Sequence, residues 1–174
     1  TSYIPTTSST VTRSADTTSI TGNNFSSWYN PSQGTFYVES EMPYYSVTPL
    51  IVPKFLSLDN RSLEMSVYQS GYCQTYSSFV PLYGGGILNT LIPAIGASLK
   101  LISSYSNSNN TLSIAVNGAI NTLNFTGTLF TNLATSLGIG YQMSGSTRYI
   151  NAHIRKIVYY PAALSNTNIR ALTN

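Results

Sequence analysis

Charged residues are scarce in this chain. Asp, Glu, Lys and Arg make up 7% of its 174 residues, against roughly 25% in a typical globular domain. None of these four types occurs from Leu101 to Thr147. The 8 basic residues are scattered apart from Arg155-Lys156, so the sequence has no basic stripe of the kind that follows nucleic-acid phosphates. We therefore expect no nucleic-acid partner.

Side chains that bind metals or form disulfides are equally few. A single cysteine, Cys73, excludes an internal disulfide, and we expect its thiol to be buried and inert. One cysteine and one histidine cannot complete a zinc site. Asp59-Asn60 offers one corner of a calcium site without an acidic cluster around it, so we expect no metal and no cofactor. No apolar run reaches the roughly 18 residues of a membrane span, so we expect no membrane insertion.

Catalytic patterns are weak as well. Glu39-Ser40-Glu41 places two carboxylates on one strand face, but we interpret them as a solvated surface rather than the flanking pair of a glycoside hydrolase. The only histidine, His153, would need Asp16 or Asp59 to form a triad, and no Gly-x-Ser-x-Gly turn presents a nucleophile. We expect a protein that is not an enzyme, with a polysaccharide-degrading domain as an open alternative.

Alternating hydrophobicity dominates what is present. Apolar residues recur at every second position in four runs: Phe36, Val38 and Met42; Leu63, Met65 and Val67; Leu99, Leu101 and Tyr105; Leu112, Ile114 and Val116. This period predicts half-buried antiparallel strands. Asn117-Gly118 separates two such runs and predicts a two-residue hairpin turn. Many short strands with frequent turns indicate a β-sandwich or barrel.

Two further segments refine this picture. Ser136 to Tyr141 alternates apolar residues with glycines, which predicts a strand whose flat side another backbone or a ligand approaches closely. The run Ile150–Tyr160 has strand composition and ends at Pro161, and Ser165 or Asn166 can then cap a short helix that carries Ile169 and Leu172.

Tyrosine is abundant, with 14 residues. An aromatic ring stacks on the C–H face of a sugar and a phenol hydrogen-bonds to its hydroxyls, so tyrosines in loops and at strand ends favour glycan binding. The candidate glycan-binding residues are Tyr44, Tyr45, Tyr72, Tyr76, Tyr141 and Arg148. Because the stretch from Met65 to Thr147 holds only Lys100, we expect this surface to be nearly neutral and its binding to be insensitive to salt.

Two stretches resemble a known family. They are Thr12 to Val38, which includes Phe25-Ser26-Ser27-Trp28-Tyr29-Asn30, and the strand–Pro–helix ending at residues 150–172. They resemble concanavalin A-like lectin/glucanase domains, in the laminin-G-like form found in tail fibres, tailspikes and virion-surface proteins of tailed phages. The resemblance implies an all-β, antiparallel jelly-roll β-sandwich with a short C-terminal helix, in which Trp28-Tyr29 contributes to packing.

The resemblance also implies a biological setting. Residues 1–174 would form a single domain, and the opening Thr1-Ser2-Tyr3-Ile4-Pro5 suggests a fragment or processed part of a longer chain. Its expected partners are a host cell-surface polysaccharide or glycan and other virion proteins, with a homo-oligomer in the full-length context. Its expected location is a virion surface or tail, outside cells. A structural decoration or oligomerisation domain without a ligand is the alternative.

Overall fold

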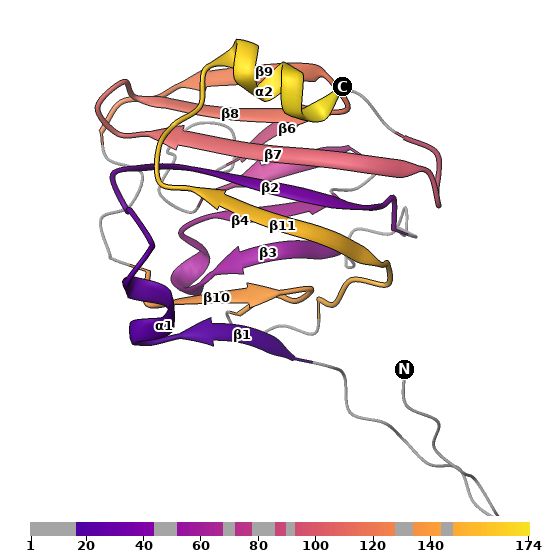
Figure 1. Cartoon of the computed structure of the whole chain (residues 1–174), viewed down its shortest axis with the longest axis horizontal. Helices are drawn as coiled ribbons and strands as arrows, with labels where there is room; N and C mark the ends of the chain where they lie inside the picture. Colours follow the sequence, from indigo (N-terminus) through magenta and orange to yellow (C-terminus); the bar gives the residue numbers. More distant parts are fainter. Residues whose placement is uncertain are drawn as a thin grey trace, which may run out of the picture.

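The chain forms a sandwich of two antiparallel sheets, seen in a computed structural model (Figure 1). The structure describes residues 17–43, 52–67, 72–77, 86–89, 93–127, 134–143 and 148–174, with the backbone alone for residues 60 and 86–89. The described elements are β1 (Thr18–Thr21), α1 (Asn23–Ser26), β2 (Gln33–Glu41), β3 (Lys54–Leu58), the 3-10 turn η1 (Asp59–Arg61), β4 (Glu64–Val67), β5 (Cys73–Tyr76), β6 (Gly86–Asn89), β7 (Ser98–Ser106), β8 (Thr111–Val116), β9 (Ala119–Asn124), β10 (Ser136–Ile139), β11 (Ile154–Tyr160) and α2 (Asn166–Thr173).

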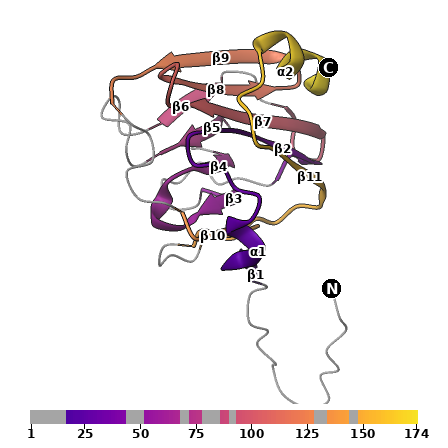
Figure 2. The same cartoon turned by 60° about the vertical axis from the view of Figure 1, so that its left-hand side comes forward.

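In both sheets, some neighbouring strands come from distant parts of the sequence. The 6-stranded sheet has the order β1-β10-β3-β4-β5-β6, and the 5-stranded sheet has the order β11-β2-β7-β8-β9. Turning the molecule by 60° shows the two sheets as separate layers (Figure 2). The jelly-roll sandwich expected from the sequence is confirmed.

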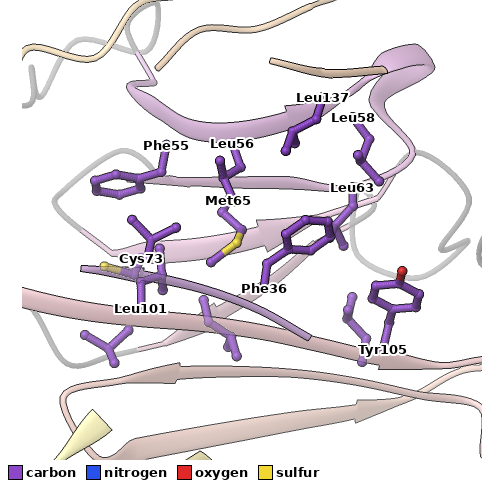
Figure 3. Packing of buried hydrophobic residues seen from close by; sticks show 14 of the residues in the cluster. Phe36, Phe55, Leu56, Leu58, Leu63, Met65, Cys73, Leu101, Tyr105 and Leu137 are labelled. Carbon is purple, nitrogen blue, oxygen red and sulfur yellow. The ribbon is translucent and has the colours of Figure 1, made fainter. Parts of the chain in front are cut away.

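The hydrophobic core fills the space between the sheets. The apolar residues of all four alternating runs lie in one buried cluster, as predicted. In Figure 3, Leu56, Met65 and Cys73 of the 6-stranded sheet face Phe36 and Leu101 of the other sheet. Because strand side chains alternate between faces, the neighbours of Met65 and Leu101 point away from the core. In β3, Phe55 and Leu56 both lie in the core, where the register with β4 shifts.

The predicted hairpin and terminal helix are both present. Asn117 and Gly118 connect β8 to β9 with φ values of 42° and 84°, the positive pair that a tight hairpin turn requires. Pro161 follows β11, and the Ser165 side chain caps α2 by accepting a hydrogen bond from the Asn168 amide at 3.3 Å. Ile169 and Leu172 of α2 pack on the outer face of the 5-stranded sheet, so that face is covered.

An aromatic cluster joins the N-terminal segment to the last strand. The ring of Phe25 stacks on Tyr29 at 4.6 Å between centroids and meets the edge of Trp28 at 5.0 Å. Tyr159 of β11 lies 5.0 Å from Trp28 and 4.7 Å from Phe36. These contacts agree with the packing role expected for Trp28-Tyr29.

Candidate functional site

Strand register brings several polar side chains together on the outer face of the 6-stranded sheet. Gly138, Ser57, Glu64 and Tyr76 are paired in one row across β10, β3, β4 and β5. Lys54, Ser66 and Gln74 form a second row across β3, β4 and β5. All alternate with core residues and therefore point outward. We call this surface the polar face, made of Lys54, Ser57, Glu64, Ser66, Gln74, Tyr76 and Gly138. Lys54, Ser57, Glu64, Ser66 and Gln74 are buried. The partly exposed side chains lie at its border and are Arg61, Tyr76, Tyr141, Arg148 and Tyr149.

A buried ion pair lies at its centre. The Nζ atom of Lys54 is 2.8 Å from Oε2 of Glu64, and their side chains are 2% and 0% exposed. Burial lowers the pKa of Lys54, and the neighbouring carboxylate of Glu64 partly opposes this effect. Two charges removed from water are strongly destabilising unless they pair, so each of these residues depends on the other.

Arg61 is the second cation of the cluster. Its Nε atom is 3.4 Å from Oε1 of Glu64, and its Cζ atom lies 4.4 Å from the centroid of the Tyr76 ring. Arg61 ends η1 with a φ of 55°, a left-handed conformation that is uncommon for a residue with a side chain. The backbone strain and the two side-chain contacts together fix the direction of the guanidinium group, whose side chain stays 35% exposed.

A tyrosine pair borders the polar face beyond β10. Tyr141 and Tyr149 form an isolated bridge, and their rings stack with centroids 6.3 Å apart and planes at 24°. The Gly140 amide donates to the Phe55 carbonyl at 2.9 Å, and the Gln142 amide donates to the Arg148 carbonyl at 3.1 Å. These bonds hold Tyr141 and Arg148 beside β3. Arg148 is close enough to Lys54 to lower its pKa, as Arg61 does.

Gly138 explains how the tyrosine segment approaches the sheet. A Cβ atom at this position would lie 2.5 Å from Cγ of Met143 and 3.3 Å from a ring carbon of Tyr141. A close approach to this glycine-containing strand was predicted from the sequence. The approaching groups are the side chains of Met143 and Tyr141.

The candidate residues from the sequence fall into two groups. Tyr76 lies on the polar face, and Tyr141 and Arg148 border it. Tyr72 immediately precedes β5 and shares the alternation of Gln74 and Tyr76. Tyr44 and Tyr45 lie outside the described residues.

Sequence reasoning missed Lys54, Arg61 and Glu64. Charged residues at outward strand positions usually indicate solvent, so these charges were not expected to meet in a buried pair. The residues that make the face charged lie just outside the stretch from Met65 to Thr147, which suggested a neutral surface. The available signal was a clustering of charge, since Lys54, Asp59, Arg61 and Glu64 occur within one short segment of a charge-poor chain.

One polar group of this face has no partner. The hydroxyl of Ser66 is buried and makes no hydrogen bond in the part of the chain that the structure describes. Ser66 is paired in register with Lys54 on one side and Gln74 on the other. Buried hydroxyls are usually hydrogen-bonded, so Ser66 is an exception within this buried part of the face.

The alternatives considered for catalysis do not come together. His153 is 87% exposed with Nδ1 3.5 Å from Oε2 of Glu41, whereas the Asp59 carboxylate accepts hydrogen bonds from the amide and hydroxyl of Thr135. Glu39 and Glu41 lie on β2, in the other sheet. Within the described ranges, no three His, Cys, Asp or Glu side chains are grouped as metal ligands, and no helix is long and apolar enough to cross a bilayer.

Two hollows lie elsewhere and are mainly apolar. A cavity of about 230 Å³ opens between the sheets, lined by Ile20, Trp28, Phe36, Leu137, Ile139, Ile157 and Tyr159. A hollow of about 420 Å³ lies beside α1, lined by Gly22, Asn23, Ser26, Tyr29, Pro31, Ala134 and Thr135. Neither is lined by a charged side chain among the described residues. A third hollow, of about 440 Å³, is lined by Ser98, Lys100, Asn117, Thr173 and Asn174 and has no aromatic ring in its lining. The polar face combines aromatic rings with polar groups, so it is the better candidate for recognising a sugar.

Solved structures share this lectin-like β-sandwich fold, although no family model and no curated protein matches the sequence. The CBM40 domain of the Ruminococcus gnavus IT-sialidase superposes with a TM-score of 0.64 at 14% identity, over 82% of this chain and 83% of that one. The same domain bound to α2,3-sialyllactose gives 0.61 at 13% identity, over 83% and 84%. The heptameric SAP-like pentraxin of Limulus polyphemus gives 0.63 at 12% identity, over 82% and 70%. At these identities the likeness defines the fold class.

Proposed function

We propose that this domain is a non-catalytic glycan-binding module and that the partly exposed border of the polar face is its binding surface. The observation that carries the proposal is the meeting of aromatic rings with hydrogen-bonding side chains at this border. Tyr76 and the stacked pair Tyr141 and Tyr149 supply ring faces. Arg61 supplies a guanidinium group that lies against the Tyr76 ring. This combination of stacking surfaces and polar groups is the general form of a sugar site.

The similar structures support this choice. The CBM40 domain of the Ruminococcus gnavus IT-sialidase binds sialyllactose with α2,3 or α2,6 linkage, and its sandwich superposes along most of both chains. The small number of carboxyl groups on the polar face also favours a binding role over hydrolysis. Glycoside hydrolysis requires two carboxyl groups flanking one bond, and Glu64 is the only acid that the described residues place on the polar face.

We further propose that the module is displayed in several copies on a phage tail or virion surface, where it contacts host glycans. The resemblance of residues 12–38 and 150–172 to phage modules supports this setting. A site built on a few rings and polar groups binds weakly as a single copy. Display in several copies multiplies the apparent affinity by about 10²–10⁴ when the copies bind simultaneously.

A glycan array with a multivalent display of the domain tests the proposal. We expect binding to specific glycans, with a clear loss in Tyr76→Ala and Tyr141→Ala. Tyr160→Ala is the matched control, because Tyr160 packs on the opposite outer face, near α2. Thermal melting of each variant separates lost binding from lost folding. If the multivalent form binds no glycan, the domain is a structural component and the proposal fails.

A further inference from the structure

We propose that the polar face selects glycans that carry a carboxylate, an inference that rests on the glycan-binding function proposed above. The ligand class is an acidic sugar, either a 2-keto acid sugar such as sialic acid or a hexuronic acid. The feature that points to this class is the local excess of fixed positive charge.

The excess follows from a simple count. Lys54, Arg61 and Arg148 bring three cations to the face or its border, and Glu64 and Asp59 of η1 bring two carboxylates among the described residues. Three minus two leaves one positive charge, and the partly exposed cations of this group are Arg61 and Arg148. The three cations come from β3, η1 and the segment before β11, so this concentration is a product of the fold.

Burial makes this excess effective. The Lys54–Glu64 pair is buried. Charges interact more strongly in a buried site because the local dielectric is low. Arg61 and Arg148 both act on Lys54 and disfavour its charged form, so the cations repel one another as they stand. An anion bound at the partly exposed guanidinium of Arg61 would relieve that repulsion, whereas a neutral sugar would not.

The chemistry of Arg61 favours a planar anion. A guanidinium group presents parallel N–H donors that match the two oxygens of a carboxylate. Glu64 and the Tyr76 ring hold this guanidinium in a defined plane, so little side-chain freedom would be lost on binding. Tyr141 and Tyr149 lie beside Arg148, so the sugar ring that carries the carboxylate can stack while the anion contacts the arginines.

Chemically matched ligands give the sharpest test. A multivalent display of the domain would be titrated with sialyllactose, with the methyl ester of sialyllactose and with lactose. A second series would use a glucuronate-containing oligosaccharide and its methyl ester. We expect at least one free acid to bind about tenfold or more tightly than its own ester, the size of one hydrogen bond between charged groups. We also expect binding of that acid to weaken several-fold between 50 and 500 mM salt, since salt screens exposed charges.

Variants assign the effect to this surface. Arg61→Gln and Arg148→Gln should remove the preference for the acid over its ester. In Arg61→Gln, Glu64 loses its contact with Arg61 but keeps Lys54, so thermal melting of each variant separates lost binding from lost folding. Arg170→Gln is the matched control, because Arg170 lies on α2 over the other sheet and is an exposed cation. It should leave the preference unchanged.

The outcomes separate this inference from the function on which it rests. Equal binding of acid and ester, binding that is unchanged by salt, or an equal loss in Arg170→Gln overturns the acidic-sugar inference and leaves a neutral glycan-binding module. Preferential binding of sulfated sugars over carboxylated ones overturns it as well. A display that binds no glycan refutes both the inference and the proposed function.

Discussion

Replacing Gly118 by valine tests the hairpin that joins β8 to β9. Gly118 has a φ of 84°, in the left-handed region, and an ideal Cβ atom there would clash with Oδ1 of Asn174. Forcing a β-branched residue into this conformation costs about 1–3 kcal/mol. The contact with Asn174 adds less, because Oδ1 is the far end of a flexible side chain that can rotate away.

The loss is measured as a change in melting temperature or in urea midpoint. A domain of this size loses about 2–4 °C for each kcal/mol, so the shift should be readily seen. Gly96→Val is the matched control, because Gly96 has a φ of 79° and no heavy atom within 4 Å of its ideal Cβ. This control reports backbone strain alone. In the double variant Gly118→Val, Asn174→Ala, the contact with Asn174 is removed, so its loss of melting temperature should approach that of Gly96→Val. If Gly118→Val melts like the wild type, the argument that this turn requires positive φ is wrong.

Three further predictions concern the thiol, an acid–base pair and metals. Burial raises the pKa of Cys73 to about 12, so iodoacetamide at pH 8 should modify it only as fast as the protein unfolds, and rapid labelling of the native protein would contradict this. Hydrogen bonds from Arg155 and then His153 lower the pKa of Glu41 below its ordinary 4.5. The ionised Glu41 therefore stabilises the fold above pH 4.5, and this stabilisation is lost as the pH falls through the lowered pKa. The melting temperatures of wild type and Glu41→Gln should therefore converge on acidification, and a gap that stays constant would argue against the contact. EDTA should leave the melting temperature unchanged. A bound ion at 100 times its Kd would add about 2.7 kcal/mol to the free energy of unfolding, so a clear drop in melting temperature on chelation would indicate a metal site.

Local signals explain why much of the fold could be predicted. The alternation that buries Leu112, Ile114 and Val116 is contained in one strand, and the Asn117-Gly118 turn requires only two residues. The end of β11 at Pro161 and the cap at Ser165 are likewise properties of neighbouring residues. Each of these features depends on backbone conformation or on the two faces of a strand, which short segments specify.

The candidate site depended on information that short segments lack. Tyr76, Tyr141 and Arg148 could be proposed singly because their residue types suit sugar binding. That Lys54 would meet Glu64 follows from the pairing of β3 with β4, and the effect of Arg148 on Lys54 follows from the pairing of β10 with β3. The pairing of β10 with β3 joins residues far apart in the chain, and no local pattern specifies that these two strands become neighbours. The neutral surface expected from the sequence therefore missed the cations that the fold gathers.

The Lys54–Glu64 pair also has an evolutionary consequence. Replacing a whole buried ion pair by apolar residues of similar volume is often neutral or stabilising, whereas losing one partner is strongly destabilising. Descendants of this chain that no longer need the charge can therefore lose both residues together, through paired substitutions, without loss of fold. Joint retention of lysine and glutamate at these positions would then trace selection for ligand recognition, and joint replacement would identify lineages that have abandoned it.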